Sequence, residues 1–427
     1  MDGEAPRRVE ASGSQGVVVG DYNTVFQYFG RAEPELSARI RIAEFQAYVD
    51  ERTAGFTGRA FAFDDIEKWL ANPAFRSGYV MVKGKPGVGK TALLSQLVKR
   101  RGWVHHFNIA QINLTSISAF LSNVCAQLIV RYGLDDSGWP PHATEDGGFL
   151  LNLLGKAASK PADRPVVVAV DALDEATDPD SPQVNPLFLP SALPDGVFLV
   201  VSVRAEHRHA NAFASRHTID LDNDSRAWND APAYIHHFLD AEGAPMLARM
   251  ASWGMAEAEF TTELANRSKG NFMYLTLVLK DIRDGLLNAE NIDSIENLPD
   301  DLQKYYRIHW DIMRNRDLYH FLRFEEPVVC LLSTINEPVS LDEVMDWTRQ
   351  FWTVKKWDLS ELNRHAIVDV LSQWGQFLNH VTVQGVRRYA LYHESFRDFL
   401  EAEVGLSDYE GAIIDATLAK ISDFRRR

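Results

Sequence analysis

The sequence has little cysteine, fewer basic than acidic residues and no long apolar run, and each shortage excludes a class of protein. Its two cysteines, Cys125 and Cys330, stand far apart in apolar surroundings, which excludes a disulfide framework and a cysteine-based metal site. The histidines occur at most in pairs, and no pair has a third ligand at a metal-like spacing. We therefore expect a protein of the reducing cytoplasm.

The apolar runs are no longer than a strand, whereas a helix needs about 20 apolar residues to cross a bilayer. The first 16 residues also lack the apolar centre of a secretory signal. We therefore expect no membrane span. The formal net charge is −15, and nucleic-acid affinity that ignores sequence comes mainly from Lys and Arg, so a nucleic-acid partner is not expected either.

A glycine-rich segment at residues 84–91 is the strongest motif that is present. It reads Gly-Lys-Pro-Gly-Val-Gly-Lys-Thr directly after an apolar run at residues 79–82, so a strand is expected to lead through this loop into a helix. Such a phosphate-binding loop (P-loop) turns backbone N–H groups and a helix N-terminus toward an anion. The alternative is a glycine turn without a ligand. The predicted nucleotide-binding residues of the segment are Gly84, Pro86, Gly87, Val88, Gly89, Lys90, Thr91 and Ala92.

Within this loop, two side chains have specific expected tasks. Lys90 should reach the β- and γ-phosphates of ATP, and Thr91 should hold Mg²⁺. A second motif supports the metal: residues 165–171 form a β-branched run that ends in Asp171, as expected of a strand buried on both faces. At the carboxyl end of that strand, Asp171 can accept hydrogen bonds from the Mg²⁺ water shell.

The acidic residues after Asp171 are displaced from their usual place. AAA+ motor ATPases usually have Glu directly after this Asp, whereas here Ala172 follows, and Asp174 and Glu175 come three and four residues later. Asp174 and Glu175 are therefore the candidates for polarising the attacking water. For either of them alone, a solvated acidic turn that caps the next helix is the alternative.

Two further segments are candidates for contact with the nucleotide. Gly58 and Arg59 end a Phe-Thr-Gly-Arg string before an amphipathic helix, where a nucleotide base often packs; an ordinary turn would explain them equally well. Arg204 ends the apolar run at residues 197–203 and would lie near the γ-phosphate. A surface ion pair is the alternative for Arg204.

The second half of the chain is predicted to be mainly helical. Residues 228–287 have the pattern of a helical lid, and residues 377–383 and 386–392 are expected to form a β-hairpin that closes a winged helix. Residues 301–400 contain 14 Asp and Glu against 12 Lys and Arg, so this winged helix lacks the basic excess of a DNA-binding one.

The order of these motifs resembles the NACHT group of STAND signalling NTPases. The resemblance covers most of the chain and includes Gly-Asn-Phe at residues 270–272 and Tyr-His-Glu-Ser-Phe-Arg-Asp-Phe-Leu at residues 392–400. It implies a switch that is off with ADP and on with ATP, in which His393 of the winged helix contacts the β-phosphate of ADP. A packed histidine on an amphipathic helix is the alternative for His393. The lid of this family usually has proline where Phe272 stands.

The N-terminal segment at residues 16–29 combines β-branched and aromatic residues with a single charge and no proline, the composition of cross-β segments. A small docked hairpin is the alternative. The segment resembles the RHIM-type amyloid signalling motif Val-x-Val-Gly-x-x-Asn, which implies pairing with an effector protein that has a matching motif. The motif residues are Val17, Val18, Val19, Gly20, Asn23 and Val25.

Together these features predict an α/β fold: a P-loop (AAA+/STAND) parallel-sheet domain, a helical lid, a winged helix and a flexible N-terminal tail. The expected boundaries are 1–30 for the amyloid motif, 31–55 for a linker helix, 56–226 for the NACHT domain, 227–298 for the lid, 299–403 for the winged helix and 404–427 for a C-terminal helix. The predicted function is an ATP/ADP switch, with slow hydrolysis, that forms homo-oligomers on activation in antiviral or immune defence.

Two other classes remain open. An initiator-like AAA+ ATPase would also join a P-loop domain to a winged helix, but with an Asp-Glu pair and a basic wing. A GTPase should contain Asn/Thr-Lys-x-Asp, and the nearest string, Ser-Lys-Pro-Ala-Asp at residues 159–163, differs in its first residue and its spacing.

Overall fold

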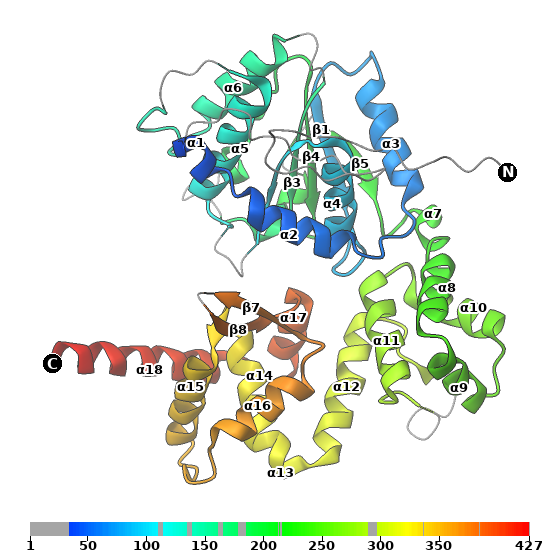
Figure 1. Cartoon of the computed structure of the whole chain (residues 1–427), viewed down its shortest axis with the longest axis vertical. Helices are drawn as coiled ribbons and strands as arrows, with labels where there is room; N and C mark the ends of the chain where they lie inside the picture. Colours follow the sequence, from blue (N-terminus) through cyan, green and yellow to red (C-terminus); the bar gives the residue numbers. More distant parts are fainter. Residues whose placement is uncertain are drawn as a thin grey trace, which may run out of the picture.

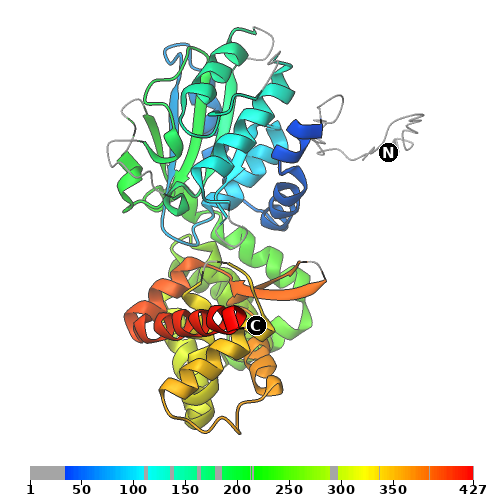
Figure 2. The same cartoon turned by 90° about the vertical axis from the view of Figure 1, so that its left-hand side faces the viewer.

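The computed structural model describes residues 34–109, 114–134, 139–160, 165–177, 185–211, 213, 216–288, 297–335, 337–383 and 385–426. The amyloid-like motif predicted at residues 17–25 lies outside these residues. In the described part, a domain built on a parallel sheet sits above a largely helical C-terminal half (Figures 1 and 2). The α/β fold with a P-loop nucleotide-binding sheet and a helical C-terminal region is therefore confirmed.

The sheet has five parallel strands in the order β2-β3-β4-β1-β5. They are β1 (Gly78–Lys83), β2 (Val104–Phe107), β3 (Val166–Asp171), β4 (Val197–Val203) and β5 (Arg216–Asp220). Every residue of β3 and β4 is buried, as their uninterrupted apolar sequences predict for strands covered on both faces. Strand β4 lies between β1, which leads into the P-loop, and β3, which ends in Asp171.

Helices cover both faces of the sheet. Alternate side chains of β1 point to opposite faces: Val80 and Val82 join one apolar cluster, and Tyr79 and Met81 join the other. The first cluster is completed by α2 (Ile42–Thr53), α3 (Ala60–Ala71) and α4 (Lys90–Arg101). The second is completed by α5 (Ile117–Tyr132) and α6 (Gly148–Ala158), with α1 (Pro34–Arg39) beside α5 (Figure 1).

The lid and the winged helix share one continuous apolar core. The lid consists of α7 (Ser225–Trp228), α8 (Ala231–Glu242), α9 (Ala244–Ser252), α10 (Glu257–Ser268) and α11 (Phe272–Asp284), and α12 (Leu302–Arg316) follows it. The Tyr306 hydroxyl of α12 lies 2.9 Å from Ser395 Oγ on α17 (Glu394–Glu403). We therefore expect these two parts to unfold together.

The C-terminal part has the helix and strand order of a winged helix. Its elements are α13 (Leu318–His320), the π-helical turn η7 (Phe321–Glu325), α14 (Glu326–Ser333), β6 (Val339–Ser340), α15 (Leu341–Val354), α16 (Arg364–Gln373), β7 (Leu378–Val383), β8 (Val386–Leu391), α17 and α18 (Ser407–Arg426). Strands β7 and β8 pair antiparallel from Leu378 opposite Leu391 to Val383 opposite Val386, which confirms the predicted hairpin.

Short 3-10 turns complete the nucleotide domain: η3 (Leu173–Glu175), η4 (Pro186–Phe188) and η5 (Arg208–Asn211). Among the helices of the described residues, none combines the length and the apolar character needed to span a bilayer. The predicted absence of a membrane span agrees with this finding.

Candidate functional site

The glycine-rich loop joins β1 to α4 and contacts the lid. Gly87 and Gly89 have φ angles of 82° and 94°, which favour glycine because a side chain would be strained there. A Cβ atom on Gly87 would lie 2.5 Å from Asn271 Oδ1, so glycine also allows the loop to approach the lid. Asn271 Nδ2 donates to Pro86 O (3.0 Å) and Met273 N donates to Gly87 O (3.0 Å). The lid therefore fixes the loop directly.

Lys90 begins α4 and points back over the loop. Its ammonium donates to Gly84 O (2.7 Å) and Lys85 O (3.1 Å). Burial lowers the pKa of Lys90, and the carboxylates of Asp174 and Asp171 act in the opposite direction. A phosphate beside this ammonium would stabilise its charged form in the same way, as expected of a P-loop lysine.

Asp171 lies at the carboxyl end of β3 and is almost fully buried. Its Oδ1 accepts a hydrogen bond from Ser202 Oγ (2.5 Å), whereas its Oδ2 has no partner among the described residues. Asn108 Oδ1 is also buried without such a partner, and Asn108 Nδ2 donates to the Asp171 carbonyl (2.7 Å). Burial raises the pKa of Asp171, and Ser202, Thr91 and Lys90 oppose that rise.

These groups fit a magnesium ion. Mg²⁺ takes oxygen ligands, often one or two carboxylates together with water and nucleotide phosphates. The unpaired carboxylate oxygen of Asp171, the Thr91 hydroxyl and the unpaired amide oxygen of Asn108 are oxygen donors of this kind. When bound, the ion would neutralise phosphate charge, and these residues would hold it or its water shell.

Arg204 is enclosed by carboxylates from two domains. Its Nε lies 2.9 Å from Asp174 Oδ2, and its backbone N–H donates to Asp174 Oδ1 (3.1 Å). The same guanidinium pairs with Asp398 Oδ2 (3.1 Å) and with Glu394 Oε2, both on α17 of the winged helix. The ion pair named as the alternative for Arg204 is thus present, and it links β4 to the winged helix.

The two displaced acids have different surroundings. Asp174 is tied to Arg204, so its carboxylate is already neutralised. Glu175 lines the cavity described below, and its pKa is raised well above its usual range by burial and then by the charges of Glu394, Asp174 and Asp171. A carboxyl with a raised pKa is less often ionised, and only the ionised carboxylate can accept a proton from water.

His393 caps the N-terminus of α17. Its Nδ1 accepts a hydrogen bond from Ser395 N (3.1 Å), so the neutral ring has its proton on Nε2. Burial lowers its pKa to about 3, and the charges of Arg204, Lys90 and Arg52 contribute. His393 is therefore a neutral donor at neutral pH, a form that suits a phosphate oxygen as partner.

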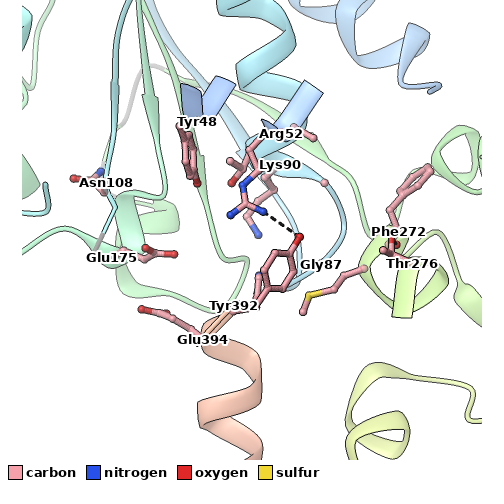
Figure 3. Close-up of a pocket in the computed structure, with 15 residues that line it drawn as sticks. Tyr48, Arg52, Gly87, Lys90, Asn108, Glu175, Phe272, Thr276, Tyr392 and Glu394 are labelled. Carbon is pink, nitrogen blue, oxygen red and sulfur yellow. Dashed lines mark hydrogen bonds between the residues drawn. The ribbon is translucent and has the colours of Figure 1, made fainter. Parts of the chain in front are cut away.

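A cavity of about 200 Å³ lies where α2, the P-loop, the lid and the winged helix meet (Figure 3). It brings residues 87 and 89–92 of the P-loop together with Glu175 and His393, which are far apart in the sequence, whereas Gly84, Pro86 and Val88 do not line it. Tyr392 of the motif at residues 392–400 also lines it, and so do Tyr48, Arg52, Asn108, Met273 and Thr276, which no sequence motif indicates. Its wall is formed by Tyr48, Arg52, Gly87, Gly89, Lys90, Thr91, Ala92, Asn108, Glu175, Phe272, Met273, Thr276, Tyr392, His393 and Glu394.

Gly58 and Arg59 do not line the cavity. Arg59 has a φ of 61° and is buried behind the loop, where its Nη2 donates to Val88 O (2.6 Å) and its backbone N–H donates to Asp230 Oδ2 (2.8 Å). A Cβ atom on Gly58 would lie 2.4 Å from the carboxyl carbon of Asp230. This segment joins the P-loop to the lid, a role that its spacing alone did not indicate.

Comparisons with known proteins agree with the nucleotide domain. Residues 55–200 match the family model described as the AAA ATPase domain. No curated protein matches the chain. The match, the P-loop and the five-stranded parallel sheet agree on a AAA-like P-loop fold for this domain. The AAA ATPase family implies binding of a nucleotide and usually Mg²⁺.

Several solved structures have a similar arrangement. They include Drosophila ORC bound to DNA (12% identity, 84% of this chain and 98% of that chain, TM-score 0.37) and Cdc6p from Pyrobaculum aerophilum (13%, 91% and 97%, TM-score 0.29). The RuvB Holliday junction branch migration motor of Thermotoga maritima is a third (15%, 80% and 95%, TM-score 0.29). At such identities and scores, these likenesses say nothing about function.

Proposed function

We propose that this chain is a nucleotide-gated signalling switch of the STAND/NACHT type, off with ADP and on with ATP. The observation that carries the proposal is the shared cavity: Tyr392, His393 and Glu394 of the winged helix line the same space as Lys90 and Thr91 of the P-loop. A nucleotide bound at the P-loop would therefore contact the winged helix, and its phosphates would influence whether the two domains stay together.

The charges around the cavity favour a diphosphate in this closed arrangement. Glu175 and Glu394 line the cavity opposite Lys90 (Figure 3). A γ-phosphate adds negative charge near the Glu394 carboxylate, and like charges about 4 Å apart repel by about 4 kcal/mol at an effective dielectric constant of 20. A ligand shifts a conformational equilibrium only through such differential contacts. ATP would therefore disfavour the closed form relative to ADP.

The ion pairs of Arg204 with the winged helix are the contacts that ATP would break. In the closed form its guanidinium bonds Glu394 and Asp398 across the domain boundary. A γ-phosphate near the end of β4 would compete with both carboxylates for this guanidinium, because Arg binds phosphate and carboxylate with the same fork of donors. The slow hydrolysis expected of a switch follows from the surroundings of Asp174 and Glu175 described above.

A DNA-binding initiator-like ATPase is the second candidate, since it too would join a AAA domain to a winged helix. The charges of the winged helix do not favour it. Arg364 on the exposed side of α16 pairs with Asp342, and Arg388 of the hairpin lies 3.4 Å from Glu343. Duplex binding that weakens steeply with salt in a gel-shift assay would favour this candidate over the switch.

The N-terminal motif, outside the described residues, completes the proposal as the signalling output. Bringing several tails together raises their local concentration, which favours cross-β pairing and recruitment of an effector protein with a matching motif. A peptide of residues 1–30 should form thioflavin-positive fibrils with a spacing of about 4.7 Å. A peptide that stays monomeric at high concentration would remove the amyloid output while leaving the nucleotide switch intact.

The proposed switch is tested by measuring the mass of the protein in solution with each nucleotide. With ADP and Mg²⁺ we expect a monomer in light scattering, and with a non-hydrolysable ATP analogue we expect a homo-oligomer several times larger. GTP in place of ATP should have little effect. The same mass with both adenine nucleotides would contradict the proposed function.

A further inference from the structure

Arg52 is a partly buried cation in the nucleotide cavity that the sequence motifs did not indicate. It lies near the end of α2, before the AAA domain, and lines the cavity with Lys90 and Gly87 (Figure 3). Its Nη1 donates to the Tyr392 hydroxyl (3.1 Å). Its Nε is buried and has no hydrogen-bond partner among the described residues.

The surroundings hold this guanidinium in place without neutralising it. Its central carbon lies 5.0 Å from the ring centre of Tyr48 and 5.3 Å from that of Tyr392, so two aromatic rings restrict it. Among the described residues, no carboxylate lies within ion-pair distance of Arg52. A charge that is partly removed from water without a counter-ion is costly, and native sites usually supply an anion or a metal to offset it.

The cavity identifies which anion fits. The P-loop backbone and Lys90 are arranged for phosphate, and Arg52 faces the same space from the side of α2 and Tyr392. A guanidinium that is already restricted loses little freedom when it binds, and its planar fork matches two phosphate oxygens. The guanidinium of Arg52 lines the cavity and would donate hydrogen bonds to such oxygens.

We propose that Arg52 is a phosphate-binding residue for the nucleoside diphosphate, contributed by the linker helix rather than by the AAA domain. The proposal rests on the proposed function, because it assigns a role in the same nucleotide site. Since Arg52 also bonds Tyr392, the residue before His393, one side chain joins the linker helix, the nucleotide and the winged helix. A change at the phosphates would thereby reach α2, which follows the N-terminal tail and the short helix α1 in the chain.

The experiment measures ADP affinity by calorimetry with Mg²⁺ in the full chain and in Arg52→Met, which keeps an apolar stem of similar length. Loss of a charged hydrogen bond to phosphate should weaken ADP binding by about 10- to 100-fold. Arg52→Met should also lose most of the rise in melting temperature that ADP gives the wild type. A purely structural role would lower the melting temperature equally with and without ADP.

Lys99→Met is the matched control. Lys99 holds α2 against α4 through Asp50 (2.9 Å), but it does not line the cavity. This variant should bind ADP within about threefold of the wild type. Equal ADP affinities for Arg52→Met and Lys99→Met would overturn the proposal.

Two further measurements cover a variant that does not fold and a wild type that does not switch. If Arg52→Met does not fold, Arg52→Gln decides the question, with a loss of at least about tenfold expected and unchanged ADP affinity overturning the proposal. If the wild type binds ADP but has the same particle mass with ADP and with the ATP analogue, the proposed switch function is contradicted. The role of Arg52 is then decided by the ADP affinities alone. If the wild type does not bind ADP, both proposals fail.

Discussion

Replacing Lys90 with alanine should remove most of the affinity for ADP and for ATP. The ammonium is held over the P-loop by Gly84 O and Lys85 O, in the position from which it would pair with a phosphate. Removing one member of a buried, hydrogen-bonded charge pair costs about 2–5 kcal/mol. This corresponds to a loss of roughly 30-fold to several thousand-fold in affinity, measured by calorimetry with Mg²⁺.

The control for Lys90→Ala is Lys99→Ala, which removes a lysine from the same helix outside the cavity wall. Its ADP affinity should stay within about threefold of the wild type. If Lys90→Ala binds ADP as tightly as the wild type, the nucleotide does not bind at the P-loop, and the assignment of the site is wrong.

Reversing the charge of Glu394 should open the switch without ATP. In Glu394→Arg, a cation replaces the carboxylate that pairs with Arg204, and two guanidinium groups then face each other at the domain boundary. Like charges at close range cost several kcal/mol, and about 3 kcal/mol changes the ratio of closed to open molecules by roughly a hundredfold. We expect oligomers in light scattering with ADP alone.

Asp415→Arg makes the same change in net charge on α18, at an exposed position away from the cavity. This control should remain monomeric with ADP. A Glu394→Arg protein that is monomeric with both ADP and the ATP analogue would show that the bond between Arg204 and the winged helix does not control assembly.

The parts of the site that the sequence predicts are those that local patterns define. The P-loop is a contiguous string, and the run ending in Asp171 is apolar throughout because β3 is covered on both faces. The hairpin β7–β8 was likewise predicted within one residue of its observed ends, since a Gln-Gly turn separates two strand-like runs. Fold class and motif positions follow from such patterns.

The contacts between distant residues could not be predicted in this way. Arg52 and Tyr392 are 340 positions apart, and only the packing of α2 beside the winged helix brings them together. The position of Arg204 at a strand end was predicted correctly. Its ion pairs with Glu394 and Asp398 could not be predicted, because both carboxylates come from a distant part of the chain. Arg59 lies behind the P-loop because its backbone is left-handed, and the spacing of the motif does not predict that conformation.

The central claim is that ADP holds the winged helix against the P-loop and ATP releases it. The distance between the nucleotide domain and the winged helix tests this claim most directly. Spin labels can be attached at Asp195→Cys in the nucleotide domain and His365→Cys in the winged helix, where the native side chains are 57% and 87% exposed. Cys125 and Cys330 are buried, so they should not react with the label. We expect a single narrow distance distribution by pulsed electron spin resonance with ADP, and a longer, broader one with the ATP analogue. The same narrow distribution with both nucleotides would contradict the claim.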